Sequence, residues 1–184
     1  MIQSINNKNV KNIIYRQVKN QDAKQFITLI NTVWRDTYNH IFPEEVFLDM
    51  ENRAESKIQN FSKHFYNDDK TFVYVAEYNG KIVGVACGRL DAEYEHYNQM
   101  NYANLQIFYV LPEYQKKGIG TTLKNLFVDW LKKHNATKYV IGVLKNNAKG
   151  RAVYENWGGK LDDYTKPFVK LGVGYEEVFY TFEI

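Results

Sequence analysis

The chain has one cysteine and three prolines among its 184 residues, and it lacks a long apolar run. A single cysteine, Cys87, excludes a disulfide within the chain and suits a reducing compartment, so we expect a cytoplasmic protein. No apolar segment approaches the ~18 residues that span a bilayer. Residues 1–11 are polar and lack the apolar core of a signal peptide. We therefore expect no membrane partner.

A strong charge of either sign is also absent. The formal net charge is +3 and the isoelectric point is about 8.7, which fits an anionic cofactor but is too small to indicate nucleic acid binding. The histidines and the lone cysteine show no metal-ligand spacing, so we predict no metal site. No repeat or low-complexity linker divides the chain. The length and the 45% hydrophobic content predict a single domain over residues 1–184, with its core in residues 12–184.

The most informative stretch runs from an apolar segment, residues 105–111, through Pro112 into a turn with two glycines. A long amphipathic pattern follows, which predicts a helix. Its apolar face comprises Ile119, Leu123, Leu126, Phe127, Trp130 and Leu131. The first turn of a helix has backbone N–H groups without internal partners. Because Gly118 and Gly120 have no Cβ, an anion can approach that backbone closely, so we interpret the turn as a pyrophosphate site.

Two glycines alone would fit a turn without a ligand, and the turn matches neither a phosphate-binding Walker loop nor a dinucleotide fingerprint. The wider pattern Val-x-Pro-Glu-Tyr-Gln-x-x-Gly-x-Gly, from Val110 to Gly120, is more specific. It resembles the acyl-CoA-binding motif of the GNAT N-acetyltransferase family. A second match lies downstream, where Tyr154 follows Asn147 by seven residues and Gly158 comes next.

The order of predicted elements is similar to that of this family. We expect a strand at residues 13–18, a helix capped by Asp22, and a helical region from Pro43 to about His64 with a break near Asn52. Strands follow at residues 71–77 and 82–89 around the hairpin turn Asn79-Gly80, then a polar loop at residues 91–101. After the central strand and helix come a strand at residues 139–144, a helix at residues 146–157, and closing strands that include residues 177–184. The predicted fold class is α/β, GNAT-like: a mixed, mainly antiparallel sheet with a parallel βαβ crossover and flanking helices.

The resemblance implies an N-acetyltransferase that moves an acetyl group from acetyl-CoA to a primary amine by direct attack. The amine would belong to a small molecule, a polyamine or a peptide. Backbone groups of the strand would contact the acetyl and pantetheine portions of acetyl-CoA. Backbone N–H groups of the turn would hold the pyrophosphate, and the side-chain amide of an asparagine would anchor the pantetheine arm. The cofactor-binding residues implied in this way are Phe108, Tyr109, Val110, Gln115, Lys116, Lys117, Gly118, Ile119, Gly120, Thr121 and Asn147.

Tyr154 is the implied catalytic acid, which would protonate the departing CoA sulfur. A general base is harder to place, because the positions where many members carry a glutamate are Asn104 and Gly142 here. We therefore expect a water relay lined by Asn104 or Gln106. The alternative bases are the acids of the polar loop: Asp91, Glu93 and Glu95.

The acceptor pocket of such proteins is usually built by the first two helices, so Trp34 and Tyr38 are the candidate substrate-binding residues. They are four residues apart and share a helical face, although core packing would also explain Trp34. An alternative to catalysis is an acyl-CoA-binding sensor or interaction module with little turnover. The apolar closing strands are compatible with a homodimer. Cys87, in a predicted strand, is expected to be a small buried apolar residue and not a nucleophile.

Overall fold

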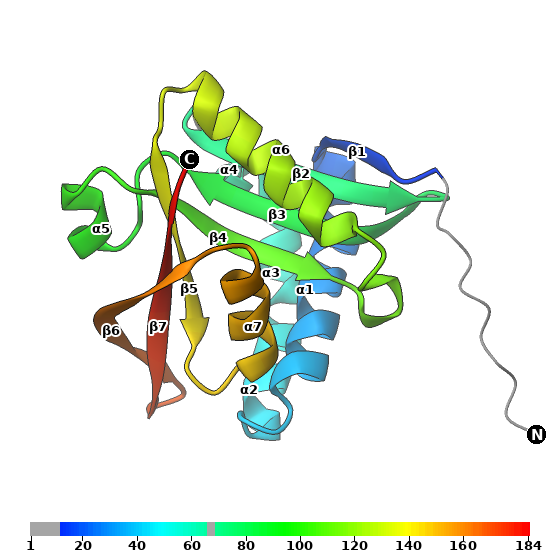
Figure 1. Ribbon diagram of the computed structural model, residues 1–184. Coiled ribbons are helices and arrows are strands. Elements are labelled where there is room, and N and C mark those ends of the chain that lie inside the picture. The colour runs from blue at the N-terminus through cyan, green and yellow to red at the C-terminus, as the bar shows by residue number, and fades with distance from the viewer. Residues whose placement is uncertain (1–11, 66–68) are drawn as a thin grey trace, which may run out of the picture.

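The computed structural model describes residues 12–65 and 69–184, and the polar stretch 1–11 lies outside the described residues. Seven strands form one sheet in the order β1-β2-β3-β4-β5-β7-β6 (Figure 1). Neighbouring strands are antiparallel except β4 and β5, which are parallel. The predicted fold class is confirmed. The strands are β1 (Ile14–Gln17), β2 (Thr71–Tyr78), β3 (Lys81–Arg89), β4 (Ala103–Val110), β5 (Lys138–Leu144), β6 (Lys160–Lys170) and β7 (Val173–Glu183).

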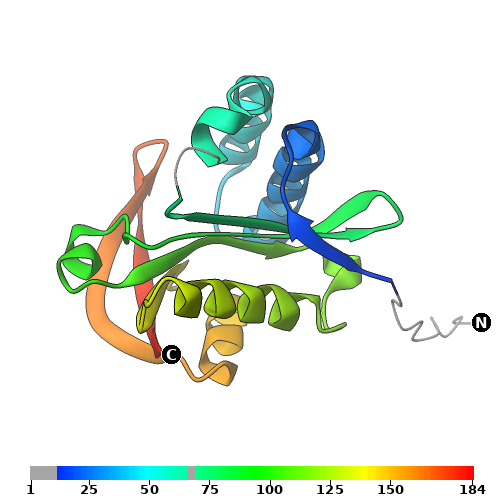
Figure 2. The ribbon, with the colours of Figure 1, turned by 90° about the horizontal axis from the view of Figure 1, so that it is seen from above.

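Helices cover both faces of the sheet. One face carries α1 to α4, and the other carries α6 and α7 (Figure 2). These helices are α1 (Ala23–Tyr38), α2 (Glu44–Asn52), α3 (Ala54–Gln59), α4 (Phe61–Phe65), α6 (Ile119–Lys133) and α7 (Ala148–Asn156). The helical region after Pro43 does break after Asn52, as predicted. None of the helices in residues 12–65 and 69–184 combines the length and the apolar character that a membrane-spanning helix requires.

The helix α6 buries the apolar face that its sequence predicts. Four of its side chains are at most 1% exposed, and burial of each such side chain stabilises the fold by roughly 1.5–3 kcal/mol. Leu126 and Trp130 lie at the margin and are half-buried. Packing of this face fixes where the first turn of α6 lies relative to the sheet. The four buried side chains are Ile119, Leu123, Phe127 and Leu131.

The strands β4 and β5 start side by side and then separate. Within the described residues they pair at Ala103–Tyr139 and Asn104–Val140, and Figure 1 shows them diverging beyond this point. The Asn104 side chain donates a 3.2 Å hydrogen bond from Nδ2 to the Val140 carbonyl at the point of divergence. A register shift against β3 leaves Gln106 as an extra residue in β4, and such a bulge bends its strand. We call the opening between the two strands the fork.

Two local predictions hold only in part. Asp22 is the N-cap residue of α1, as predicted, but its carboxylate makes no cap bond to that helix. It pairs with the guanidinium of Arg16 at 2.6 Å and accepts the Lys19 N–H at 2.7 Å, because strand β1 brings a stronger partner within reach. The segment 91–101 is not wholly a polar loop, since it contains the short helix α5 (Glu95–Gln99). Tyr97 of α5 is fully buried, with its ring 5.2 Å from that of Phe179.

Candidate active site

The turn before α6 exposes a row of backbone amides. Lys116 and Gly118 have left-handed backbones, with φ of 57° and 82°, and Gly118 is the N-cap of α6. Within the described chain, no acceptor is assigned to the N–H groups of residues 116–121. Residues 115–118 and Thr121 are exposed. The turn therefore presents its donors, and the positive end of the α6 dipole, to solvent.

Side chains around the turn hold its shape. Gln115 donates from Nε2 to the Val110 carbonyl at 3.0 Å, which ties the turn to the end of β4. Lys117 donates from Nζ to the Glu113 carbonyl at 2.7 Å, which ties the turn to the residues just before it. A Cβ on Gly120 would lie 3.3 Å from Cζ of Phe108, which shows how closely α6 packs on β4. Lys116, Ile119 and Thr121 complete the set of predicted turn residues.

The predicted strand residues lie along the fork. Beyond Asn104, the edge of β4 that faces β5 pairs with no described strand. Phe108 packs against Trp157, with ring centroids 5.1 Å apart, and Val110 is 9% exposed. The hydroxyl of Tyr109 accepts a 2.8 Å hydrogen bond from Nε1 of Trp34. The backbone of this strand segment is therefore available to a ligand between β4 and β5.

Three tyrosine hydroxyls from different elements gather beside the fork. Burial raises the pKa of Tyr109 well above its ordinary value, and the nearby Tyr38 raises it further. Burial also raises the pKa of Tyr154, with a second contribution from Tyr38. The hydroxyl of Tyr38 accepts a 3.1 Å hydrogen bond from Nδ2 of Asn147. All three phenols are thus protonated at neutral pH, and Tyr154 has a proton to give.

Asn147 has two structural contacts. Its Oδ1 accepts the Gly150 N–H at 2.9 Å and so caps α7, while its Nδ2 donates to Tyr38. A Cβ on Gly150 would lie 2.8 Å from Nδ2 of Asn147, which explains the glycine there. An asparagine amide has two N–H donors and two acceptor lone pairs. One donor and one lone pair therefore remain for the predicted contact with a pantetheine arm.

The predicted acceptor residues form part of an aromatic wall. Trp34 stacks on Phe42 with ring centroids 5.7 Å apart and an interplanar angle of 7°. Tyr38 is buried, 5.0 Å from the Trp34 ring. Phe168, from the hairpin of β6 and β7, lies 6.4 Å from Trp34, and Nζ of Lys170 lies 5.6 Å from the same ring. Trp34 thus combines core packing with a position next to Tyr109.

Sequence reasoning missed Glu177. This β7 residue is half-buried, and its Oε1 accepts a 3.0 Å hydrogen bond from the Tyr94 hydroxyl. A Cβ on Gly142 would lie only 2.5 Å from Oε1 of Glu177. Burial raises the pKa of Glu177, the Tyr94 hydrogen bond lowers it, and the nearby Glu93 raises it further. A signal was present, because a glycine inside an apolar strand often marks the close approach of a neighbouring group.

The other proton-accepting candidates have varied surroundings. Glu93 accepts a 2.8 Å hydrogen bond from Nε2 of Gln106, which links the polar loop to the bulge in β4. Asp91 pairs with Lys70 at 2.8 Å, and Glu95 is exposed. Asn104 is 1% exposed, and its Oδ1 has no partner among the described residues. A relay through Asn104 or Gln106 therefore stays a prediction.

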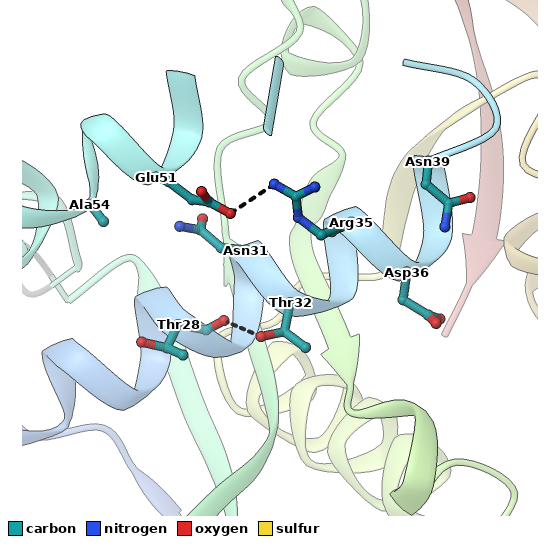
Figure 3. A pocket seen from close by; sticks show the side chains of 8 residues that line it. All are labelled: Thr28, Asn31, Thr32, Arg35, Asp36, Asn39, Glu51 and Ala54. Carbon is teal, nitrogen blue, oxygen red and sulfur yellow. Dashed lines mark hydrogen bonds and ion pairs between the residues drawn. The ribbon is translucent and has the colours of Figure 1, made fainter. Parts of the chain in front are cut away.

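A hollow on the surface lies away from these groups. It measures about 640 Å³, and Figure 3 shows its polar lining on α1 and α2. Its described lining contains none of the predicted site residues. Arg35 is held there by Glu51 at 2.9 Å and by Glu44 at 2.7 Å. A second hollow, of about 230 Å³, adjoins the end of β5 and is lined in part by Ile41, Leu144 and Tyr175.

Cys87 is buried, as predicted, and burial raises the pKa of its thiol, which makes it a poor nucleophile. In the described part of the chain, no group of three or more His, Cys, Asp or Glu side chains is arranged to hold a metal ion.

Solved structures with the same fold are numerous. The PaiA N-acetyltransferase of Thermoplasma acidophilum, solved with coenzyme A, is 20% identical with a TM-score of 0.71, covering 94% of this chain and 99% of that one. The ribosomal-protein-alanine N-acetyltransferase of Brucella melitensis is 20% identical with a TM-score of 0.65, covering 93% and 99%. The yncA protein of Salmonella typhimurium, solved with acetyl-CoA, is 19% identical with a TM-score of 0.63, covering 94% of each chain.

At these identities the likeness establishes the fold. A search of curated protein sequences gave no match. The sequence itself matches the acetyltransferase (GNAT) family over residues 28–158, which include both motifs and the fork. Members of this family use acetyl-CoA as cosubstrate, in agreement with the predicted cofactor. The chain therefore belongs to the acetyltransferase (GNAT) family.

Proposed function

We propose that the protein transfers an acetyl group from acetyl-CoA to a primary amine by direct attack. The observation that carries this proposal is the row of exposed, unpartnered amides at the head of α6, next to the open fork between β4 and β5. A diphosphate needs several convergent donors, and a thioester needs an unpaired strand edge along which to lie. Both features occur side by side here.

In this proposal the amides of residues 116–121 bind the pyrophosphate of acetyl-CoA. The pantetheine arm runs into the fork along Phe108, Tyr109 and Val110, with the amide of Asn147 on its other side. A backbone N–H of β4 holds the thioester oxygen and stabilises the negative charge that grows on it during attack.

Tyr154 is the acid for the leaving group. The amine nitrogen forms a bond to the thioester carbon, the C–S bond breaks, and the sulfur takes the proton of the Tyr154 hydroxyl. The proton that the acylated nitrogen then loses restores this phenol. Burial raises the pKa of Tyr154, so this phenol is protonated at neutral pH and can donate to the sulfur as negative charge grows there. The products are an N-acetylated amine and coenzyme A.

The acceptor amine approaches past the wall of Trp34 and Tyr38. Aromatic faces attract cations, and Nζ of Lys170 already lies 5.6 Å from the Trp34 ring. An amine that is protonated in solution, on a small molecule, a polyamine or a peptide, fits such a wall.

A panel of primary amines tests the proposal. The protein is first titrated with acetyl-CoA by calorimetry and is then assayed for release of the CoA thiol with each amine. Binding together with amine-dependent thiol release and an acetylated product supports the transferase. Tight binding without turnover on any amine would favour the acyl-CoA sensor instead, and absence of binding would remove both.

A further inference from the structure

Glu177 lies where the fork opens. The last residue of β5 that pairs with β4 is Val140, and Gly142 is two residues further along. The Glu177 carboxylate occupies the space beside Gly142 that a side chain would fill, 2.5 Å from the position of a Cβ. The neighbouring strand therefore places a carboxylate at a point where β5 has no side chain.

The register of β5 and β7 fixes the face on which this carboxylate lies. Glu177 is opposite Leu144, and directly opposed residues of paired strands point to the same face. Leu144 packs in one cluster with Tyr38 of α1, so Glu177 lies on the α1 face of the sheet. Tyr154 belongs to α7, which covers the opposite face (Figure 2). The two groups thus flank the fork from opposite faces.

Such an arrangement suits direct attack. The incoming amine and the departing sulfur lie on different sides of the thioester carbon, so one proton acceptor and one proton donor are needed there. The charge of Glu177 also helps to raise the pKa of Tyr38, so the Glu177 carboxylate lies near one of the three tyrosines beside the fork. The carboxylate is therefore close to the groups that surround the predicted acetyl site.

The charged and titratable neighbours of Glu177 come from three places: the loop before α5, strand β6 and helix α1. Tyr94 donates a hydrogen bond to it, Glu93 repels it, and Lys166 of β6 attracts it, while Tyr38 faces it from α1. The net effect, dominated by burial, raises the pKa of Glu177. A carboxylate with a raised pKa is a better proton acceptor near neutral pH than an ordinary one.

We propose that Glu177 is the general base that takes a proton from the acceptor amine, an inference that rests on the proposed function. The ammonium gives one proton to the Glu177 carboxylate, which passes it to solvent. The freed nitrogen lone pair forms the C–N bond, and the C–S bond then breaks. The sulfur takes the proton of Tyr154, and the second proton lost by nitrogen restores that phenol.

The test compares two neighbouring glutamates. Glu177→Gln keeps an oxygen that can accept the Tyr94 hydrogen bond but removes the base. Glu176→Gln is the matched control, because Glu176 is exposed and pairs with Lys145 at 2.8 Å. We expect Glu177→Gln to lower kcat/KM for the amine by about 10²-fold at neutral pH. Its affinity for acetyl-CoA and its melting temperature should stay within error, and Glu176→Gln should stay within about twofold of the wild type.

The pH profile gives a readout that a structural role would not produce. In the wild type, kcat/KM falls as pH drops through the pKa of Glu177, because the protonated acid cannot accept a proton. Tyr94→Phe removes a hydrogen bond that lowers the pKa of Glu177. The fall in kcat/KM on the acidic side of the pH profile should therefore occur at higher pH in this variant. Gly142→Ala should reduce the rate like Glu177→Gln, since its Cβ forces the carboxylate away.

The outcomes separate this inference from the proposed function. If the wild type acetylates an amine and Glu177→Gln does so at the same rate with the same acidic limb, Glu177 is not the base, although the transferase stands. Loss of acetyl-CoA binding or early melting in Glu177→Gln would assign a structural role and overturn the inference as well. A wild type that binds acetyl-CoA but acetylates no amine would contradict the proposed function itself.

Discussion

The side-chain amide of Asn147 donates a 3.1 Å hydrogen bond to the hydroxyl of Tyr38 and so joins α7 to α1 across 109 residues of sequence. The same amide caps α7 through its oxygen. A single side chain therefore positions both the helix that carries Tyr154 and the tyrosine, Tyr38, that adds to the raised pKa of that phenol.

Substitution of Asn147 should separate these two roles. Asn147→Ala removes both contacts, and we expect a loss of about 1 kcal/mol in the free energy of unfolding from the cap alone. Asn147→Asp keeps an oxygen for the Gly150 N–H but loses the donor to Tyr38. Urea denaturation should therefore show a smaller loss for the aspartate, while both variants turn over more slowly. Equal stability and equal turnover in all three proteins would contradict the dual role.

The turn glycine Gly118 offers a direct test of the pyrophosphate site. Gly118→Ala places a Cβ on a backbone with φ of 82°, which costs about 1–2 kcal/mol, and sets it among the exposed amides. Gly172→Ala is a matched control, because φ is 78° there and a Cβ also meets no atom within 4 Å. Both variants should lose similar stability in thermal melts. Only Gly118→Ala should weaken acetyl-CoA binding in calorimetry, by about tenfold, or 1.4 kcal/mol. Weaker binding in both would point to instability alone.

Removal of the proposed acid should affect the chemical step. We expect Tyr154→Phe to lower kcat by about 10²-fold with little change in the dissociation constant for acetyl-CoA, since a phenol proton contributes only as sulfur departs. Because the pKa of Tyr154 is raised, the wild-type activity should persist until pH rises through that high value. Tyr15→Phe on β1, at the far edge of the sheet, should match the wild type. The measurement is the pH dependence of kcat for the wild type, Tyr154→Phe and Tyr15→Phe. A Tyr154→Phe variant with the kcat of the wild type would show that Tyr154 is not the acid.

The ion pair of Asp22 with Arg16 should make stability depend on acid pH. Burial raises the pKa of Asp22, but its hydrogen bonds to Arg16 and Lys19 lower it by more, so it lies below the ordinary 3.8. A depressed carboxylate pKa contributes stability above 3.8 that is lost as pH falls through the folded value. Asp22→Asn should cost roughly 2–3 kcal/mol at pH 7, below the figure for a fully buried pair because Arg16 is 21% exposed.

The control for that variant is an exposed pair. Glu44→Gln disrupts the pair with Arg35, in which the Glu44 side chain is 60% exposed, and it should change stability by less than about 1 kcal/mol. Denaturation at pH 7 and below pH 3.8 should show the difference between wild type and Asp22→Asn shrinking in acid. If the difference in unfolding free energy between the wild type and Asp22→Asn stays constant across this pH range, the ion pair of Asp22 with Arg16 does not cause the loss of stability.

Local chemistry explains why the turn before α6 was predictable. The glycines and the apolar face of α6 lie within one short stretch, so spacing alone predicts an amide-rich helix start beside a strand. The hairpin at Asn79-Gly80 was predictable for the same reason, and the structure gives both residues positive φ, 50° and 77°. The break after Asn52 and the parallel crossover also follow from patterns that are contiguous in sequence.

Long-range pairing explains what was missed. Glu177 reaches the fork only because the register sets Gly142 opposite Phe179, and no spacing within a single segment reveals that register. The carboxylate of Asp22 turned to Arg16 instead of capping α1, because strand β1 supplied a charged partner. Tyr97 of the polar segment became fully buried, since aromatic rings from β7 and β6 close around it.

The sequence alone determined the family, the order of the elements and the exposed amide turn, because these depend on residues that are neighbours along the chain. Only the tertiary structure decided which side chains share the fork: Tyr38 with Asn147, Trp34 with Tyr109, and Glu177 with the gap at Gly142. The physical reason is that strand register and helix packing bring together groups far apart in sequence, and burial in that shared space then sets their pKa values.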